Sequence, residues 1–471
     1  MKRCTSNMAW AQTLVEGLVG KGITHAVLSP GSRHTPLVLA MHHCAQTHAL
    51  RIHDLIDERS AAFYALGLSR MSGEAVLLSC TSGSAGAHYL PALIEASHDR
   101  LPIIALTADR PPELQGVGAP QTTHQHGFYT EHVRLFVDTG LSNEADTSDA
   151  MREVAERAFS AATGPNAGPV HINVPFRKPL WDDEVSEEEP ADPFTPQPSS
   201  RAEESAIASA LRRMRSTGRG IIVCGPGDLG ILGRSRAEAA RSLKESVGRV
   251  ADQLAWPLIV DGASCVRGGQ RLPGGVLVGD TLTRSEELRD RLKPDLIVRL
   301  GQIPTSTPLR RWLAEVGENT TILLDQDGRL SDPDGLNVEL LKGDLIQTLE
   351  ALGAELEDQG GVTDEDWTQA WRSSAKAIED AQQEALEQRD ALWSGSCARA
   401  LAATLPEGGL IHLASSLAVR AFDGFSGATK EGVHVSSNRG VNGIDGTLAT
   451  AFGQARVWPG PIGVLIGDLA F

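Results

Sequence analysis

Short apolar runs that alternate with stretches of helical periodicity constrain the fold of this chain more than any other feature. The runs are rich in Val, Ile and Leu, and the chain between them carries apolar residues at helical spacing. Parallel strands need a long crossover, usually a helix, so this alternation predicts a parallel sheet covered by helices. The pattern occurs in three successive segments, and we therefore expect three α/β domains with largely parallel sheets.

The expected elements follow from these runs. Strands are expected at 26–29, 75–79, 103–106, 170–174, 220–224, 257–261, 295–301, 321–325, 409–414, 433–436 and 463–466. Helices are expected at 36–46, 58–68, 85–97, 150–162, 416–424 and 444–452. The last strand, 463–466, is apolar throughout, which is typical of a buried parallel strand.

Two breaks in composition separate the three segments. The stretch 182–198 is acidic and rich in Pro, and the stretch 353–366 is similar but shorter. Both indicate surface linkers. The domains are therefore predicted at 1–181, 200–352 and 367–471, and the third looks incomplete at its C-terminus.

The charge and the cysteines exclude several classes of protein. The formal net charge is −17, which argues against non-specific binding to nucleic acid or to an anionic membrane. No apolar stretch approaches the length of a membrane span. The six cysteines are scattered without a C-x-x-C pair, which favours a reducing cytoplasm over a disulfide or metal-thiolate framework.

Small-residue turns follow two of the expected strands. Ser29 to Arg33 reads SPGSR, and Thr81 to Gly86 reads TSGSAG. Free N–H groups at a helix N-terminus and the fork of Arg33 suit an anion, although an ordinary strand–helix turn explains each motif taken alone. The second turn is not a nucleophile elbow, because Ser82 stands where G-x-S-x-G requires Gly, and it is not a phosphate loop of the Walker type, because no Gly-Lys-Ser/Thr follows.

A long polar loop follows the strand at 103–106. Loops at the carboxyl ends of strands carry ligand contacts, so Arg110 and Gln121 are candidates. His124 and His126 lie nearby, but two histidines without a third ligand are usually solvated rather than metal-bound.

Glu58 opens a helix that is rich in small residues. An acid in a first helical turn commonly just complements the helix dipole. The alternative is a functional carboxylate enclosed by the Ala, Phe and Tyr side chains around it. Periodicity does not distinguish the two.

A literal G-x-G-x-x-G spans Gly225 to Gly230. A dinucleotide site also needs an acid about 20 residues further on, at the end of the next strand. The candidate Asp261 lies 31 residues after Gly230. A structural turn is therefore the favoured interpretation, and a nucleotide-dependent oxidoreductase the weaker one.

The third segment gathers polar residues after each of its expected strands. Ser416 and Arg420 are one helical turn apart and can face one site. The stretch 437–446, SNRGVNGIDG, is too polar and glycine-rich for a routine crossover, and it contains Arg439 and Ile444. Gly467 and Asp468 follow the last strand, where an Asp is a natural metal ligand.

Taken together, SPGSR, DERSAAFYALG, TSGSAGAHYLPALIEA, TADRPPEL, SNRGVNGIDG and GDLAF resemble the thiamine-diphosphate enzymes. More narrowly, they resemble the 2-succinyl-5-enolpyruvyl-6-hydroxy-3-cyclohexene-1-carboxylate synthase (MenD) family of menaquinone biosynthesis. The resemblance covers both outer segments densely and in order. It covers the middle segment mainly in architecture.

The resemblance implies a pyrimidine-binding domain, a Rossmann-like central domain and a diphosphate-binding domain. It also implies a homodimer or a dimer of dimers, with active sites between the first domain of one subunit and the third domain of its partner. The implied reaction is decarboxylation of 2-oxoglutarate and addition of the succinyl carbanion to isochorismate. Thiamine diphosphate would serve as electron sink, with Mg2+ or Mn2+ holding its diphosphate. Such an enzyme is a transferase of the carboligase type.

By the same resemblance, Glu58 hydrogen-bonds the aminopyrimidine of the cofactor. Both substrates carry several carboxylates, and the matching pocket positions hold Ser32, Arg33, Arg110, Gln121, Ser416, Arg420 and Arg439. Ile444 matches the apolar residue that supports the bent cofactor, and Gly467 and Asp468 match the diphosphate and metal site.

The sequence departs from the family pattern at two places. Thr307 stands where the family usually has a lysine, so Arg310 or Arg311 is the candidate substitute. The family motif after Asp468 continues to an Asn that also binds the metal, whereas this sequence ends at Phe471. A catalytically incompetent, truncated form of the same synthase is therefore the alternative to an active enzyme, and such a form is expected to bind the cofactor weakly or not at all.

Overall fold

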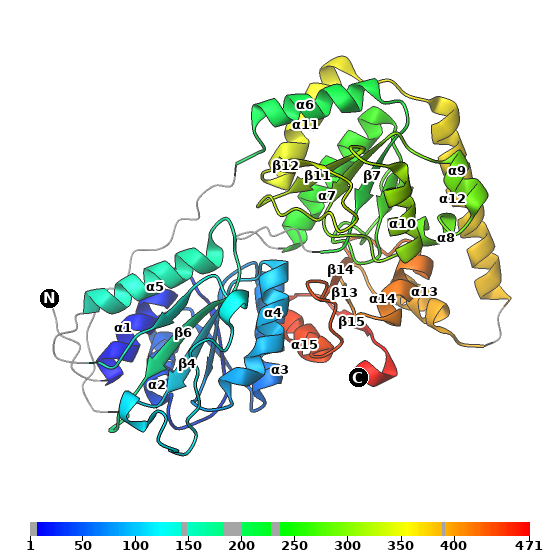
Figure 1. The fold of residues 1–471 in the computed structure, drawn as a ribbon. Coiled ribbons are helices and arrows are strands. Elements are labelled where there is room, and N and C mark those ends of the chain that lie inside the picture. The colour runs from blue at the N-terminus through cyan, green and yellow to red at the C-terminus, as the bar shows by residue number, and fades with distance from the viewer. Residues whose placement is uncertain (1–6, 143–147, 182–199, 228–235, 389–390) are drawn as a thin grey trace. The chain divides into compact units, whose positions relative to one another are not determined.

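Three parallel sheets form the framework of the protein, as the sequence predicts (Figure 1). The computed structural model describes residues 7–142, 148–181, 200–227, 236–388 and 391–471. The chain divides into two compact units, which are described separately. The first unit comprises residues 1–197, 232–235 and 448–457, and the second comprises 198–231, 236–447 and 458–471. The expected linker at 182–198 lies outside the described residues.

The first unit is built on a six-stranded sheet of order β2-β1-β3-β4-β6-β5. All of its strand pairs are parallel. The strands are β1 (His25–Leu28), β2 (Arg51–Asp54), β3 (Val76–Cys80), β4 (Ile103–Asp109), β5 (Phe136–Asp138) and β6 (Val170–Pro175). The sequence patterns did not predict β2 and β5, which are short, partly exposed strands at the two edges.

Helices cover both faces of this sheet (Figure 1). Successive residues of a strand point to opposite faces, so Ala26 and Leu28 pack with α1, α2 and α5, whereas Val27 packs with α3 and α4. The helices are α1 (Asn7–Val19), α2 (Thr35–Thr47), α3 (Glu58–Ser72), α4 (Leu90–Asp99) and α5 (Ser148–Thr163). Short 3₁₀ helices are η1 (Gly86–Tyr89), η2 (Pro112–Leu114) and η3 (Thr130–His132).

One helix from the end of the chain packs on the first unit. α15 (Thr447–Val457) contacts α3 through glycines of both helices. A Cβ added to Gly67 would lie 2.1 Å from the carbonyl oxygen of Thr450, and a Cβ added to Gly453 would lie 2.1 Å from that of Tyr64. The two backbones therefore approach so closely that only glycine fits at either position.

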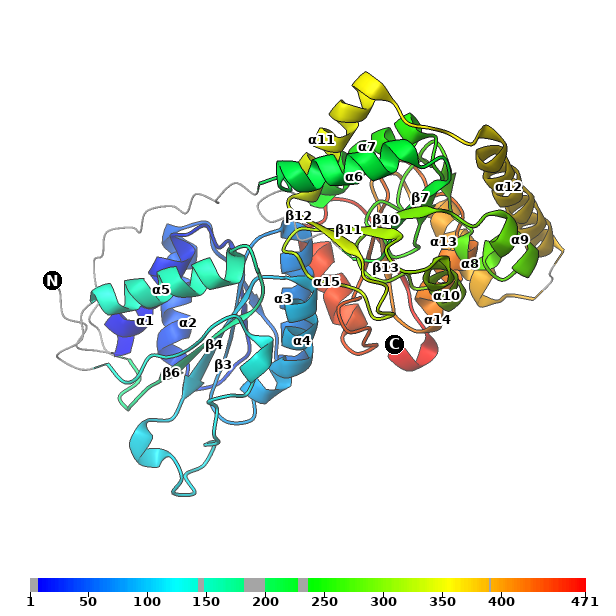
Figure 2. The ribbon, with the colours of Figure 1, turned by 45° about the horizontal axis from the view of Figure 1, so that its top comes forward.

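The second unit contains the middle sheet, of order β12-β11-β10-β7-β8-β9. Its strands are β7 (Gly220–Cys224), β8 (Leu258–Val260), β9 (Gly275–Val276), β10 (Leu296–Leu300), β11 (Thr321–Asp325) and β12 (Glu339–Lys342). One face packs against α6 (Glu204–Ser216), α7 (Arg236–Leu254) and α11 (Leu345–Gln359). The other packs against α8 (Gly279–Leu282), α10 (Thr307–Val316) and α12 (Glu365–Glu387), next to α9 (Glu286–Arg291) (Figure 2).

The third sheet is small, with the order β14-β13-β15. It consists of β13 (Leu410–Leu413), β14 (His434–Ser437) and β15 (Ile462–Leu465), and it packs against α13 (Ser394–Thr404) and α14 (Leu417–Phe425). β15 ends before the 3₁₀ helix η4 (Asp468–Ala470). The expectation of a buried last strand is wrong, because β15 lies at the edge of this sheet and is only half-buried.

Buried polar contacts join the third sheet to the middle sheet within the second unit. The Asp423 carboxylate on α14 accepts a hydrogen bond from the Gly262 N–H at 2.6 Å. The Arg267 guanidinium donates to the carbonyl oxygens of Val260, at 2.6 Å, and Asp423, at 3.3 Å. Both side chains are almost fully enclosed, so they fix α14 to the end of β8.

None of the helices in the described ranges combines the length and apolar character required to cross a bilayer.

Candidate active site

The two small-residue turns of the first unit contact one another. β1 and β3 are neighbouring parallel strands, so the turns that follow them leave the same edge of the sheet. The Arg33 N–H donates to Thr81 Oγ1 at 3.2 Å. A Cβ added to Gly31 would lie 2.3 Å from the Thr81 Cβ, so glycine is required where the turns meet.

Arg33 is buried, whereas its neighbour Ser32 is exposed. The Arg33 guanidinium donates one hydrogen bond, from NH1 to the carbonyl oxygen of Phe176 at 2.8 Å. Its Nε has no partner among the described residues. A buried donor left without an acceptor suits a ligand that carries a carboxylate.

The polar loop after β4 brings Arg110 and Gln121 together. Arg110 NH2 donates to Gln121 Oε1 at 3.2 Å, and Ser82 Oγ donates to the Gln121 carbonyl oxygen at 3.1 Å. Gln121 has a φ of 54°, and its backbone lies against Gly83. The loop and the TSGSAG turn therefore present Arg110 and Gln121 beside Ser82.

Glu58 is the first residue of α3 and is half-buried. Asp57 caps this helix, because its carboxylate accepts a hydrogen bond from the Ser60 N–H at 2.8 Å, and that bond holds the pKa of Asp57 below its ordinary value. The Glu58 carboxylate has no hydrogen-bond or ion-pair partner in the described part of the chain. A carboxylate at a helix N-terminus with free lone pairs can accept a hydrogen bond from a cofactor ring nitrogen.

In the second unit, Ser416, Arg420 and Arg439 follow two neighbouring strands, β13 and β14. Arg420 NH1 donates to the Ser416 carbonyl oxygen at 2.6 Å, one turn earlier on α14. Arg439 NH1 donates to Ser415 Oγ at 3.4 Å. Arg420 is exposed and Arg439 is buried, so the two cations lie at different depths behind the same strand ends.

Ile444, Gly467 and Asp468 are all exposed. Ile444 keeps 43% of its surface accessible, so its side chain is available for contact with a ligand. Asp468 lies just beyond β15, which is the other neighbour of β13.

Asp468 can bind a divalent cation only together with other ligands. Within the described ranges, no group of three or more His, Cys, Asp or Glu side chains could hold a metal ion. Mg2+ usually takes one or two protein carboxylates together with phosphate oxygens and water, so a single carboxylate at this position is compatible with a metal–diphosphate site. His126 Nε2 lies 2.7 Å from Asp138 Oδ2.

The middle sheet offers no support for a dinucleotide site. The Asp261 carboxylate is buried and accepts hydrogen bonds from the Thr305 N–H at 2.6 Å and the Ala263 N–H at 2.8 Å. A Cβ added to Gly225 would lie 1.9 Å from the carbonyl oxygen of Gln302, so this glycine serves chain packing. Gly230 lies outside the described residues.

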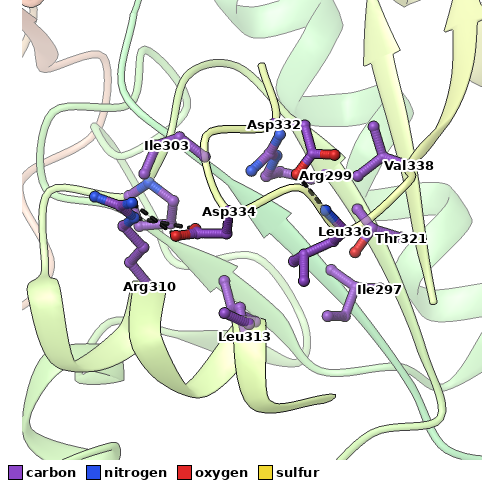
Figure 3. Close-up of a pocket in the computed structure, with 12 residues that line it drawn as sticks. Ile297, Arg299, Ile303, Arg310, Leu313, Thr321, Asp332, Asp334, Leu336 and Val338 are labelled. Atoms are coloured by element: carbon purple, nitrogen blue, oxygen red, sulfur yellow. Dashed lines mark hydrogen bonds and ion pairs between the residues drawn. The ribbon is translucent and has the colours of Figure 1, made fainter. Parts of the chain in front are cut away.

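Beside the middle sheet, a cavity of about 20 Å³ lies between β10, α10 and the loop before β12, and Figure 3 shows the residues that line it. Asp334 forms an ion pair there with Arg310, NH2 to Oδ1 at 2.7 Å, and the buried Arg299 donates to the Ser331 carbonyl oxygen. A space of this size holds about one water molecule. Of the two candidate substitutes for the family lysine at Thr307, Arg310 is therefore paired with Asp334. Arg311 is exposed and has no partner among the described residues.

The sequence patterns missed the residues that support Arg110 and Gln121. Gln125 and Asn173 are buried and hydrogen-bonded to one another, Nε2 to Oδ1 at 2.9 Å. A polar residue within the apolar strand 170–174 was the available signal for Asn173. Gln125 had none, because a glutamine in a polar loop is ordinarily exposed.

The first unit corresponds to a known class of domain. Residues 8–130 match the family model described as "Thiamine pyrophosphate enzyme, N-terminal TPP binding domain". The protein is therefore a thiamine-diphosphate-dependent enzyme by class.

Relatives define the family more narrowly. The chain is 36% identical to the 2-succinyl-5-enolpyruvyl-6-hydroxy-3-cyclohexene-1-carboxylate synthase of Geobacillus kaustophilus, over 98% of this chain and 78% of that protein. It is 37% identical to the synthase of Geobacillus thermodenitrificans, over 99% of this chain and 78% of that protein. It is 34% identical to the synthase of Halorubrum lacusprofundi, over 98% of this chain and 78% of that protein.

The chain belongs to the 2-succinyl-5-enolpyruvyl-6-hydroxy-3-cyclohexene-1-carboxylate synthase family. The resemblance seen in the sequence motifs is thereby confirmed. The comparisons support neither the oxidoreductase nor the incompetent form of the synthase.

Proposed function

We propose that this protein decarboxylates 2-oxoglutarate and transfers the succinyl unit to isochorismate, as a thiamine-diphosphate-dependent transferase of menaquinone biosynthesis. The observation that carries the proposal is the identity of 36% over 98% of the chain to a synthase of that name. The donors around Arg33, Arg110 and Gln121 support it, because both substrates present carboxylates. We also propose that it acts as a homodimer or a dimer of dimers in the cytoplasm.

The residues of this chain have distinct roles in the proposal. Glu58 accepts a hydrogen bond from the aminopyrimidine, and Asp468, with the backbone at Gly467, binds the metal ion that holds the diphosphate. Ile444 packs against the cofactor. When bound, thiamine diphosphate supplies an electron sink for the electron pair left by decarboxylation.

Substrate binding falls to the arginines and their polar neighbours. Arg33 and Arg110, with Ser32 and Gln121, bind carboxylates at the first unit, and Arg420 and Arg439, with Ser416, do so at the second. Planar guanidinium groups fix a carboxylate in two directions at once and so orient the reacting carbon. Because Arg310 is bound to Asp334, Arg311 is the candidate for the role of the family lysine.

The proposal predicts CO2 release that requires 2-oxoglutarate, isochorismate, thiamine diphosphate and Mg2+ or Mn2+. Glu58→Gln should lower kcat by at least about 100-fold, the usual scale for losing a positioned proton acceptor. The exposed Glu131→Gln serves as control and should leave kcat unchanged. An active Glu58→Gln variant would refute the role of this carboxylate, and a wild-type protein without turnover would refute the proposed function.

A further inference from the structure

Gln125 is a buried side chain at the centre of a hydrogen-bond network in the first unit. Only 1% of its surface is accessible. Its Oε1 accepts a hydrogen bond from the Gly83 N–H at 2.9 Å. Its Nε2 donates to Asn173 Oδ1 at 2.9 Å and to the Ala108 carbonyl oxygen at 3.1 Å. Both N–H donors of the amide are therefore used, and the side chain has one defined orientation.

Asn173 extends this network across the sheet. Its Nδ2 donates to Asp109 Oδ2 at 3.1 Å and to Asp138 Oδ2 at 2.7 Å. Asp109, Asp138 and Asn173 belong to β4, β5 and β6, so one amide ties together the ends of three neighbouring strands. Networks in which every member is satisfied stiffen the chain around them.

Asp109 connects the network to the loop that carries Arg110. Its Oδ1 accepts hydrogen bonds from the Arg110 N–H at 2.7 Å and from Gln115 Nε2 at 3.1 Å. The start of the loop is thus held through the same carboxylate that Asn173 contacts.

Gly83 connects the network to Gln121. A Cβ added to Gly83 would lie 3.4 Å from the Gln121 carbonyl oxygen, so the two backbones are in contact. The adjacent Ser82 Oγ donates to that same oxygen at 3.1 Å. Gln125 therefore holds the turn against which the backbone of Gln121 rests.

We infer that Gln125 is a positioning residue for substrate binding, acting through Gly83 on Gln121 and through Asn173 and Asp109 on Arg110. Gln125 itself does not contact substrate. Its amide fixes the distance between the TSGSAG turn and the loop 110–121, so that the two carboxylate-binding side chains are held in place before substrate arrives. The inference rests on the proposed function for the identity of the substrates.

The test compares Gln125→Met with Gln12→Met, which removes another buried glutamine amide of the same unit. Gln125→Met should lower kcat/KM for 2-oxoglutarate and isochorismate between about 10- and 100-fold, since small misplacements of a binding group have effects of this size. Its affinity for thiamine diphosphate with Mg2+, measured by calorimetry, should not change. Gln12→Met should change neither quantity. Ser82→Ala, which leaves the buried network intact, should show a smaller loss of kcat/KM in the same direction.

Hydrogen exchange provides a readout that does not depend on turnover. The Gly83 amide and the peptides of residues 110–121 should exchange at least about tenfold faster in Gln125→Met and at the wild-type rate in Gln12→Met. Unchanged exchange at Gly83, wild-type kcat/KM in Gln125→Met, or an equal kinetic loss in the control would each overturn the inference. Absence of turnover in the wild type would refute the proposed function, and the exchange data would still decide whether Gln125 holds the loop.

Discussion

At the scale of single residues, a fully enclosed guanidinium contacts two carboxylates in the first unit. Arg70 on α3 lies 2.6 Å from Asp99 on α4, NH2 to Oδ2, and 3.7 Å from Glu95 Oε1. The side chains of Arg70 and Asp99 are 0% and 2% exposed. Arg70 therefore contacts two buried carboxylates at once.

Replacing Arg70 should accordingly destabilise the protein far more than replacing a surface arginine. Arg70→Met removes a buried cation that contacts two buried carboxylates, and we expect it to lower the free energy of unfolding by about 3–5 kcal/mol. Arg177→Met breaks the exposed pair with Glu113 and should change the free energy of unfolding far less, because solvent screens this pair. Urea denaturation of the two variants measures the difference, and equal losses would contradict this account.

At the scale of elements, the contact between α3 and α15 depends on two glycines. Any side chain at Gly67 or Gly453 would collide with a backbone carbonyl of the facing helix. Backbone carbonyls at a helix contact cannot yield as a flexible side chain can, so the helices must separate if either glycine is replaced.

Gly67→Ala should therefore loosen α15 from the first unit, although alanine is the better helix former. Gly424→Ala is the matched control, because this glycine lies in α14 with nothing within 4 Å of an added Cβ. The control should be neutral or stabilising by up to about 1 kcal/mol. Hydrogen exchange of residues 447–457 measures the effect, and slow exchange in Gly67→Ala would show that the contact tolerates a methyl group.

The elements that sequence patterns predicted are those with the strongest apolar character. The runs that became β3, β4, β7 and β10 are buried on both faces, so their composition alone identifies them. β2 was missed because Arg51 and Asp54 at its ends face solvent, and a four-residue charged strand has no distinctive pattern. The packing of α15 on α3 was equally invisible, since it joins residues nearly 400 positions apart.

The residues of the candidate site likewise differ in whether a local sequence pattern could indicate them. Arg33, Arg110 and Gln121 stand in recognisable polar turns after apolar strands, so the sequence indicated them. Gln125 acts through three buried hydrogen bonds that no local pattern records. Assignment of roles to individual residues, such as Glu58 and Asp468, rests on family resemblance and stays a prediction.

At the scale of the whole molecule, the two units should respond to pH in opposite ways. In the first unit, burial lowers the pKa of His25, His34 and His53 to about 4 and that of His171 to about 3. In the second, burial and the neighbouring Asp261 raise the pKa of Asp423 to about 8. The histidines are therefore neutral in the folded protein, and the raised pKa of Asp423 means that this side chain binds a proton more readily in the folded than in the unfolded protein.

The signs follow from proton binding in the two states. Between pH 6.5 and 4 the unfolded first unit binds more protons through its histidines, so this unit loses stability as pH falls, by about 1.4 kcal/mol per pH unit for each histidine. Between pH 4 and 8 the folded second unit binds the extra proton at Asp423, so this unit loses stability as pH rises. Hydrogen exchange resolved by unit, corrected for intrinsic rates, tests both slopes. His34→Leu should reduce the first slope by the share of one of the four histidines, and Asp423→Asn should remove the second slope. Parallel slopes in the two units would contradict the assignment.

The buried contacts of Arg267 also bear on how the chain is made. This arginine donates to Ser426 Oγ, 159 residues further along the chain. At a synthesis rate of roughly 5–20 residues per second, Arg267 leaves the ribosome some 8–30 s before that partner does. Until then the guanidinium can reach the Val260 carbonyl oxygen but lacks its acceptors at Asp423 and Ser426. The contact between the middle sheet and α14 therefore forms only after α14 is translated, and in this interval the nascent chain carries a cation with part of its hydrogen bonds unmade.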